Sequence, residues 1–281
     1  MREFSPEVYQ IVEPWKSSYQ PGMALPDDGI SCLQAEVTLK SDGKLGEQTR
    51  MELCPGDKIC NTLSGECFLF CGLINHEQGI TVAHALDPGN GIAIKSEPDR
   101  TVSVQVGKCR ATFEKLPLPG GGQLTADLAL LELDMAVCSV GNTVWWPYRG
   151  RGRTFQIKVY DGQEISKDTA VIILDQNGHF QIGCIHRTQL TDEGMDDVMG
   201  ICASENEEVS ITQSGDSGAL VMSIPNNEDD ILYVYGIVIG ISTYPNDKSM
   251  TIANSLPKVI QEISTELVDV MPNIEFACSL H

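Results

Sequence analysis

The sequence has no hydrophobic run long enough to cross a membrane. Its longest apolar stretch, residues 231–241, contains glycine and falls well short of the about 20 residues that a transmembrane helix needs. Basic residues are also scarce, because 19 Lys and Arg stand against 39 Asp and Glu and give a net charge of −20. Nucleic acids and anionic membrane surfaces are bound through Lys and Arg. We therefore expect neither nucleic acid nor a membrane as a partner.

The first residues of the chain, MREFSPEVYQ, lack the apolar core of a signal peptide. We therefore expect a cytoplasmic protein, with secretion as the alternative. The ten cysteines are then expected to be thiols, since disulfides persist mainly in oxidising compartments. Four of them cluster and are a candidate zinc site, but they lack the paired spacing and the nearby histidine that are typical of structural zinc sites. That cluster consists of Cys54, Cys60, Cys67 and Cys71.

The composition is that of a globular, turn-rich protein. Hydrophobic residues make up 42% of the 281 positions, and 26 glycines and 14 prolines interrupt them. This fits one large domain or two smaller ones with a substantial core. Acidic residues gather late in the chain, and we interpret these segments as solvated loops. The segments are TDEGMDDV (191–198), ENEE (205–208) and NNEDD (226–230).

Most of the chain is predicted to form short β-strands, because apolar alternation and β-branched runs lie between turn formers. The predicted strands are residues 36–39, 102–106, 154–160, 170–174, 179–183 and 231–241. One helix is predicted over residues 256–267, where apolar residues recur at helical spacing after Ser255. We interpret residues 116–122 as a loop and WWPYRGRGR (145–153) as a crossing between two halves of the protein.

Three motifs contain the residue types of a nucleophilic site. Ser217 lies in SGDSGALV (214–221), where small neighbours let the backbone approach a substrate carbonyl. A serine hydroxyl needs a base and an acid that orients that base. Upstream, ITVAHAL contains His84 and ADLALLELD contains Asp127. An acid at the head of such an apolar strand is unusual unless a partner pairs with it.

The chain order histidine, aspartate, serine is that of chymotrypsin, and the motifs together resemble the trypsin-like serine proteases of the chymotrypsin fold. FLFCGLIN (68–75) is similar to the strand before the catalytic histidine. YGIVIGI (235–241) is similar to the strand that lines the primary specificity pocket. The resemblance covers about residues 60 to 267, and several motifs in register are more specific than one.

The resemblance implies an all-β protein with two six-stranded antiparallel β-barrels, chymotrypsin-like, and a C-terminal α-helix. It implies a first barrel over residues 46–145 and a second barrel with the helix over residues 146–270. An N-terminal extension, 1–45, and a tail, 271–281, flank them.

In this interpretation His84 is the base, Asp127 orients it and Ser217 is the nucleophile. The N–H groups of Gly215 and Ser217 are expected to form the oxyanion hole. No cofactor and no metal are expected, because the triad supplies both base and nucleophile. The expected substrate-binding residues are Ile211 at the base of the specificity pocket and Ile239, Gly240 and Ile241 along its wall. An apolar base leaves Arg or Lys unpaired, so we expect cleavage after small or medium apolar residues.

The sequence departs from the family at its cysteines and at its activation motif. Ala85 follows the histidine where secreted relatives have a cysteine, so its usual partner, Cys71, has no disulfide to form. Cys184 and Cys202 match another of the family's pairs only approximately. No Ile-Val-Gly-Gly sequence precedes the first barrel, which leaves the partner of Asp216 undetermined, because in the family a new α-amine pairs with that aspartate.

The function predicted from the sequence is that of a serine endopeptidase with a protein or peptide substrate. One alternative is a catalytically latent, protease-like interaction module, suggested by the missing activation sequence. Another is a protease domain that processes a larger polyprotein or a neighbouring domain, with fusion to other domains as its partner.

Overall fold

The computed structural model describes residues 51–74, 78–95, 103–148, 151–162, 165–192, 194–203, 208–225, 230–245 and 248–266. The chain divides into two units, Met1–Gln34 and Ala35–His281. The first unit lies outside the described residues, as do the predicted strand at 36–39, the extension at 1–45 and the tail at 271–281. All described residues belong to the second unit.

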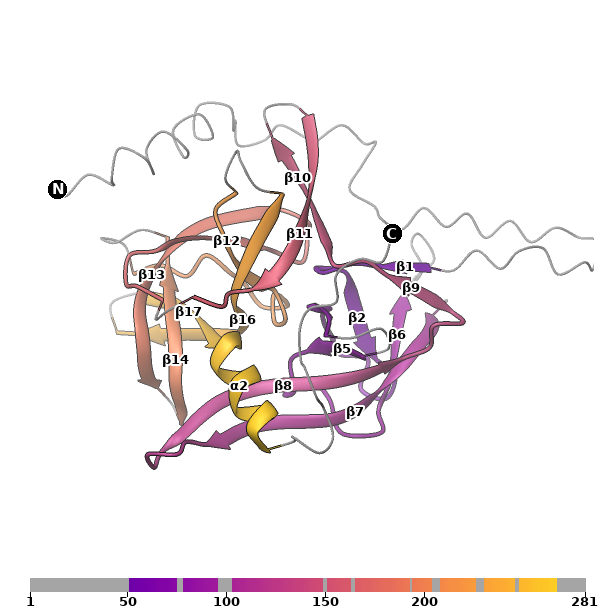
Figure 1. Ribbon diagram of the computed structural model, residues 1–281, viewed down its shortest axis with the longest axis horizontal. Helices are drawn as coiled ribbons and strands as arrows, with labels where there is room; N and C mark the ends of the chain where they lie inside the picture. The colour runs from indigo at the N-terminus through magenta and orange to yellow at the C-terminus, as the bar shows by residue number, and fades with distance from the viewer. Residues whose placement is uncertain are drawn as a thin grey trace, which may run out of the picture. The chain divides into compact units, whose positions relative to one another are not determined.

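The first half of this unit is a seven-stranded antiparallel sheet that curls on itself (Figure 1). Its strands are β2 (Lys58–Asn61), β3 (Cys67–Leu69), β4 (Gly72–Leu73), β5 (Gln78–Thr81), β6 (Gly91–Lys95), β7 (Ser103–Pro117) and β8 (Gln123–Leu133). The order across the sheet is β3-β2-β6-β7-β8-β5-β4. Only Phe70 and Cys71 separate the edge strands β3 and β4, so the two edges meet and together act as one strand of a six-stranded barrel.

The second half is a closed six-stranded barrel with two further strands attached. Its strands are β10 (Thr143–Tyr148), β11 (Arg151–Val159), β12 (Ala170–Leu174), β13 (Phe180–Asp192), β14 (Met195–Cys202), β15 (Leu220–Ser223), β16 (Ile231–Tyr244) and β17 (Lys248–Ser255). The antiparallel order β16-β15-β12-β13-β14-β17 closes because β17 also pairs with β16. β11 joins β16 in parallel, and β10 pairs with β11 as an antiparallel hairpin. A short parallel pair, β1 (Met51–Leu53) and β9 (Cys138–Val140), completes the described strands.

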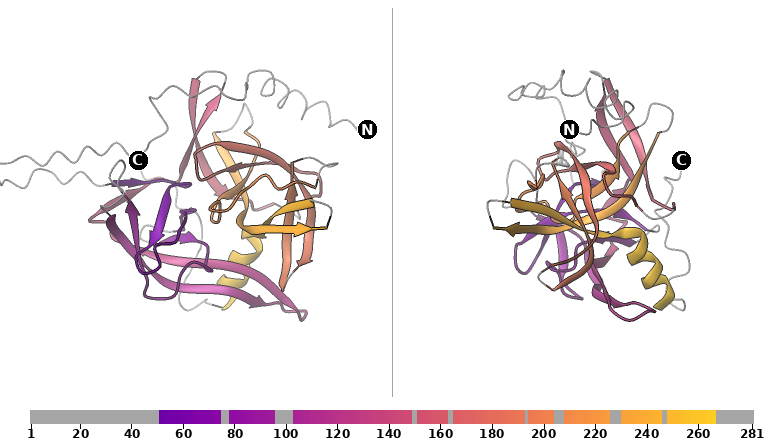
Figure 2. Two further views of the ribbon diagram at one scale, coloured as in Figure 1. Left: turned by 180° about the vertical axis from the view of Figure 1, so that it is seen from behind. Right: turned by 90° about the vertical axis from the view of Figure 1, so that its left-hand side faces the viewer.

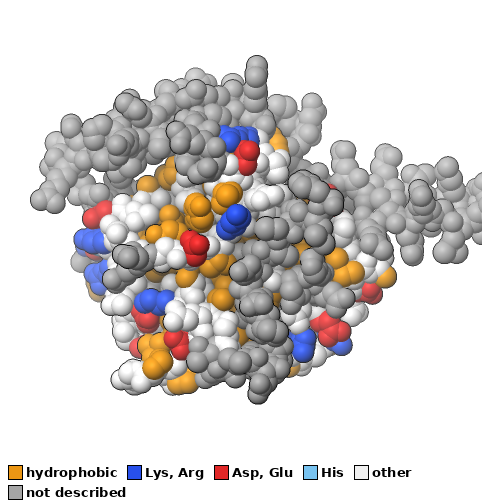
Figure 3. Space-filling view, viewed as in Figure 1, with side chains coloured by type: hydrophobic (Ala, Val, Ile, Leu, Met, Phe, Trp, Pro, Cys, Tyr) orange, Lys and Arg blue, Asp and Glu red, His pale blue; other side chains and the backbone are white. Residues whose placement is uncertain are grey.

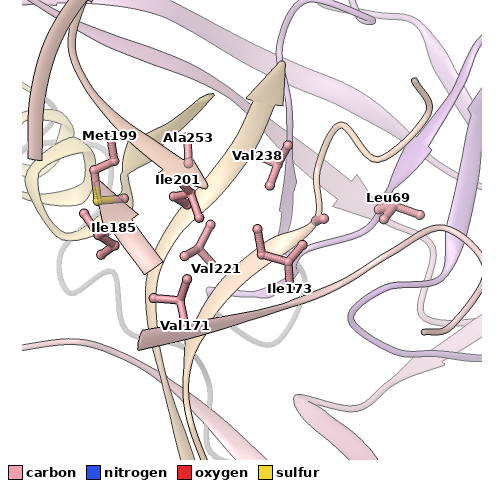
Figure 4. Close-up of a cluster of buried hydrophobic side chains, with 10 residues drawn as sticks. Leu69, Val171, Ile173, Ile185, Met199, Ile201, Val221, Val238 and Ala253 are labelled. Carbon is pink, nitrogen blue, oxygen red and sulfur yellow. The ribbon is translucent and has the colours of Figure 1, made fainter. Parts of the chain in front are cut away.

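Every strand of the closed barrel contributes to one buried apolar cluster (Figure 4). Alternate residues of a strand point to the same side, so Val171 and Ile173 of β12 and Met199 and Ile201 of β14 all face inward. The other members are Ile185, Ala219, Val221, Val238, Ala253 and, from the first barrel, Leu69. Leu69 lies at one side of the cluster in Figure 4, which places β3 against the second barrel.

Two polar contacts hold the long β7–β8 hairpin against the second barrel. Asn254 of β17 donates its side-chain N–H to the carbonyl of Ala126 and accepts the N–H of Ile237 at 3.0 Å. The hydroxyl of Thr125 accepts the N–H of Asp196 at 2.7 Å. The helix α2 (Leu256–Glu266) packs across β7, β8, β16 and β17, as Figure 1 shows. These contacts fix β8 relative to the second barrel.

The all-β fold of two barrels with a C-terminal helix is confirmed, as are the strands near 102–106, 154–160, 170–174, 179–183 and 231–241. The predicted crossing at 145–153 is wrong. Thr143–Tyr148 pairs with residues 151–156 in register, so this segment is the β10–β11 hairpin, which projects from the second barrel in Figures 1 and 2.

The interpretation of residues 191–198 as a solvated loop is also wrong, because Met195–Cys202 is a strand and Val198 is buried. Asp197 of this strand is paired with a cation, since Lys258 of α2 donates to both of its carboxylate oxygens at 3.0 Å. On the face shown in Figure 3, described acidic and basic side chains are likewise interspersed. Within the described ranges, no helix is long and apolar enough to span a membrane.

The prediction that all ten cysteines are thiols is wrong for one pair, because Cys60 and Cys67 form a disulfide. They lie opposite each other where β2 and β3 pair, so the hairpin itself brings them together. These two cysteines therefore do not support the expectation of a reducing compartment. Cys71 and Cys202 are buried thiols, so neither the bridge to position 85 nor a Cys184–Cys202 bridge forms. Cys32 and Cys278 lie outside the described residues.

Candidate active site

His84 lies in the loop after β5, and Asp127 lies in the first half of β8, where the two side chains meet. The loop after β5 contains His84, and β5 pairs with β8 in register from Gln78 to Thr81. The imidazole Nδ1 of His84 lies 2.7 Å from one carboxylate oxygen of Asp127. The other oxygen accepts the backbone N–H groups of Ala83 at 2.9 Å and of His84 at 2.8 Å. One carboxylate thus holds both the backbone and the ring of the histidine.

The protonation of this pair follows from the chemistry of a carboxylate. An ionised carboxylate only accepts hydrogen bonds, so Nδ1 of His84 carries the hydrogen and Nε2 has the free lone pair. The hydrogen bond to Asp127 raises the pKa of His84 above its usual range, and partial burial opposes this shift. The side chain of His84 is 41% exposed and that of Asp127 only 13%. The side chain of His84 is therefore open to solvent, while that of Asp127 is largely shielded.

Asp127 has a backbone φ of 41°, in the left-handed region that Asp tolerates better than most residues. The peptide unit just before it is held by Asn254 through the carbonyl of Ala126. Contact with the second barrel thereby helps to keep the aspartate in this uncommon conformation. Sequence analysis missed Asn254, because nothing near it in the chain relates it to residue 126.

Ser217 lies in a tight turn between the predicted oxyanion-hole glycine and β15. Gly215 and Gly218 have φ values of 99° and 91°, which favour glycine. A Cβ atom on Gly218 would lie 2.3 Å from the carbonyl oxygen of Leu69. The carbonyl of Ser217 accepts the N–H of Leu69 at 2.9 Å. The small residues of the motif are therefore needed for close contact between this turn and β3.

β3 and the residues after it link the serine turn to the histidine loop. The carbonyl of Leu69 accepts the hydroxyl of Thr81 at 2.7 Å, three residues before His84. The thiol of Cys71 donates to the carbonyl of Gly218 at 3.1 Å, and its N–H donates to Ile80 at 3.0 Å. Through its thiol and its backbone N–H, Cys71 thus contacts the segments of both predicted catalytic residues.

The N–H groups of Gly215 and Ser217 have no acceptor among the described residues. Their neighbours differ, since Asp216 N–H donates to Gln213 and Gly218 N–H donates to Val238. Two unclaimed donors in one turn are what an oxyanion hole requires. Within the same described ranges, no hydrogen bond joins the hydroxyl of Ser217 to the imidazole of His84.

The carboxylate of Asp216 accepts hydrogen bonds from backbone N–H groups of the same chain. Its side chain is 1% exposed, and its two oxygens accept the backbone N–H groups of Gln176 at 2.9 Å and Gln213 at 2.8 Å. Burial raises the pKa of this carboxyl, the two N–H groups lower it, nearby Asp175 raises it and Lys58 lowers it. The sequence left this partner undetermined, and the backbone N–H of Gln176 gave no sequence signal.

The predicted substrate-binding residues differ in how deeply they are buried. Ile211 is partly buried and packs against the core cluster, with its side chain over Gly183. Ile239 is buried, and Ile241 is 39% exposed. The space around the Cα of Gly240 is open, because a Cβ atom there would meet nothing within 4 Å.

In the part of the chain that the structure describes, no group of three or more His, Cys, Asp or Glu side chains is placed to hold a metal ion. The zinc alternative also loses two of its four cysteines to the Cys60–Cys67 disulfide.

No protein-family model matches the sequence, and no curated protein matches it. Solved structures do resemble the fold. Protease A of Thermobifida fusca is 15% identical, with a TM-score of 0.48 over 75% of this chain and 95% of that one. A Nocardiopsis protease is 13% identical, with a TM-score of 0.49 over 75% and 96%. A glutamic-acid-specific serine protease is 12% identical, with a TM-score of 0.50 over 74% and 96%.

The chain therefore has the two-barrel fold of the trypsin-like, chymotrypsin-fold serine proteases. The similar structures are those of hydrolases that act on peptide bonds. At such low identity the likeness establishes the fold, and the chemistry of this chain depends on its own residues.

Proposed function

We propose that the protein is a serine endopeptidase with His84, Asp127 and Ser217 as its catalytic triad. The observation that carries the proposal is the set of three hydrogen bonds that Asp127 accepts from His84 and its loop. The carboxylate fixes the imidazole at 2.7 Å and two backbone N–H groups besides, which leaves Nε2 as an accessible base. The turn of Ser217 is tied through β3 to the loop of that base.

The proposed reaction passes through an acyl-enzyme. The Oγ of Ser217 attacks the scissile carbonyl while Nε2 of His84 takes its proton. The N–H groups of Gly215 and Ser217 stabilise the oxyanion, and each such donor is worth about 3 kcal/mol of barrier. As the carbonyl re-forms, the peptide C–N bond breaks and His84 gives its proton to the leaving amine. A water molecule, activated by the same base, then hydrolyses the ester.

The proposed substrate is a protein or peptide with a small or medium apolar residue before the scissile bond. The largely apolar set Ile211, Ile239, Gly240 and Ile241 supports this preference, since Arg or Lys would find no counter-charge among these side chains. A peptide library with this position randomised tests it. Clear selection of Arg or Lys would contradict the proposed preference.

One observation favours a second candidate, a latent protease-like interaction module. The hydroxyl of Ser217 is not hydrogen-bonded to His84 within the described residues. Catalytic hydrogen bonds are often long before substrate binds, and both oxyanion donors are unclaimed. We therefore favour the active protease over the latent module.

Labelling with a fluorophosphonate probe tests the proposal, because only an activated serine reacts with it. We expect the native protein to be labelled and the Ser217→Ala variant to be unlabelled. Ser214→Ala is the matched control, since it removes an exposed hydroxyl three residues away and should label normally. Correctly folded protein that does not react would contradict the proposed function and favour the latent module.

A further inference from the structure

The inference concerns what orients the proposed oxyanion hole, and it rests on the proposed function. The peptide unit between Ser214 and Gly215 has the carbonyl of Ser214 at one end and the N–H of Gly215 at the other. A peptide unit is planar and trans, so these two groups point in opposite directions. Any contact that fixes the Ser214 carbonyl therefore fixes the direction of the Gly215 N–H.

The side chain of Gln176 makes that contact. Its Nε2 donates to the carbonyl of Ser214 at 2.7 Å, across 38 positions of sequence. Its Oε1 accepts from the ammonium of Lys58 on β2 at 3.2 Å. The amide group is thereby held at both ends, between the first barrel and the serine turn.

The backbone of Gln176 is fixed as well. Its N–H donates to Asp216, the residue between the two oxyanion donors. The turn that contains it is held by Asp175, which is buried and accepts the N–H groups of Asn177 at 2.8 Å and His179 at 2.9 Å. Gln176 is therefore presented to the serine turn from a rigid support.

The fit between Gln176 and Gly215 is close. A Cβ atom on Gly215 would lie 2.6 Å from Oε1 and 2.7 Å from Nε2 of Gln176. The side chain thus occupies the space directly beside the Cα of Gly215 and lies against the peptide unit that it hydrogen-bonds.

We propose that Gln176, anchored by Lys58, is a positioning residue that sets the direction of the Gly215 N–H in the oxyanion hole. It does so together with Asp216 and without an α-amine released by cleavage. All of these residues belong to the described part of the chain.

The test is the Gln176→Glu variant, which keeps the size of the side chain but cannot donate to the Ser214 carbonyl when ionised. Labelling with the fluorophosphonate probe at pH 8 gives a maximal rate and a half-saturating concentration. We expect the maximal rate to fall at least about tenfold, toward the about 100-fold loss caused by removing an oxyanion donor, with half-saturation within about twofold. Asn177→Ala, an exposed neighbour in the same turn, is the control and should keep the native rate.

A second measurement does not depend on activity. The backbone amide resonance of Gly215 should shift more in Gln176→Glu than in Asn177→Ala, with both variants folded as judged by thermal unfolding. A native labelling rate in Gln176→Glu, or an unmoved Gly215 resonance, would overturn the role of Gln176. If native protein is not labelled at all, the proposed function fails, and the Gly215 resonance alone still decides whether Gln176 orients this peptide.

Discussion

At the scale of single residues, Asp127 binds three donors with one carboxylate. Two are backbone N–H groups of the histidine loop and the third is the imidazole of His84. The backbone contacts fix where the loop lies, and the ring contact fixes which nitrogen carries the hydrogen. An amide in place of the carboxylate would keep the shape but donate to Nδ1, which moves the hydrogen to Nε2 and removes the base.

We therefore predict that Asp127→Asn folds but loses activity. Asn tolerates the left-handed backbone of this position, and the wrong imidazole tautomer costs about 10⁴-fold in rate in such triads. The labelling rate of the native protein should rise with pH through the pKa of His84, above its usual range because Asp127 stabilises the imidazolium. Rates measured from pH 5 to 9 check both statements.

The control for this prediction is Asp87→Asn, an exposed carboxyl three residues from His84, which should keep the native pH profile. Stability follows the same linkage. The pKa of His84 is raised on folding, so its contribution is complete below about 6.5, the ordinary histidine pKa. It is lost as the pH rises through the folded-state pKa. A native rate that is flat over this range would contradict the role of His84 as base.

At the scale of elements, the turn before β15 is packed against β3. Leu69 donates its N–H to Ser217, accepts the hydroxyl of Thr81, and reaches the core cluster of the second barrel with its side chain. Gly218 permits this approach because its missing Cβ leaves space for the Leu69 carbonyl. The turn of Ser217 and the histidine loop therefore share one support, although they belong to different barrels.

Gly218→Ala should lower the free energy of unfolding by about 2–5 kcal/mol. The added Cβ would lie 2.3 Å from a backbone oxygen and sits at a φ of 91°. A left-handed conformation costs about 1–2 kcal/mol for a residue with a Cβ, and overpacking adds about 1–3 kcal/mol. Urea denaturation measures the change. Gly120→Ala, where a Cβ meets nothing within 4 Å, is the control, and equal stability of the two variants would show that β3 does not constrain this turn.

At the scale of the whole molecule, the Cys60–Cys67 disulfide stabilises the hairpin formed by β2 and β3. Cys60 and Cys67 close a short loop, with a sequence separation of 7. Asn61, inside that loop, donates its side-chain N–H to the carbonyl of Ala85, next to His84. The hairpin that the disulfide closes therefore supports the histidine loop.

We predict that Cys60 and Cys67 resist alkylation in the denatured, unreduced protein and react after reduction. Cys202 is the internal control and should react in both cases, because it is a thiol. Loop-closure entropy gives the disulfide about 2–3 kcal/mol of stability, so the Cys60→Ser, Cys67→Ser double variant should unfold at lower urea. Alkylation of Cys60 and Cys67 without reductant would show that the pair is reduced in the isolated protein.

The sequence by itself predicted many of the strands, the terminal helix and the motifs that contain His84, Asp127 and Ser217. It did so because these signals are local. Alternating apolar residues mark a strand, and glycines on either side of Ser217 mark a turn with positive φ. The interpretation of residues 145–153 failed where local composition and pairing disagreed, since aromatic and glycine residues that read as a crossing pair in register as a hairpin.

Only the tertiary structure decided what holds the site in place. Gln176 meets Lys58 across 118 positions and Asn254 meets Ala126 across 128. Such contacts exist only after two closed barrels pack together, and glutamine, lysine and asparagine fit many environments. No short-range pattern therefore distinguishes these three residues from other polar residues. The positions of the serine turn and of Asp127 nevertheless depend on the contacts that these residues make.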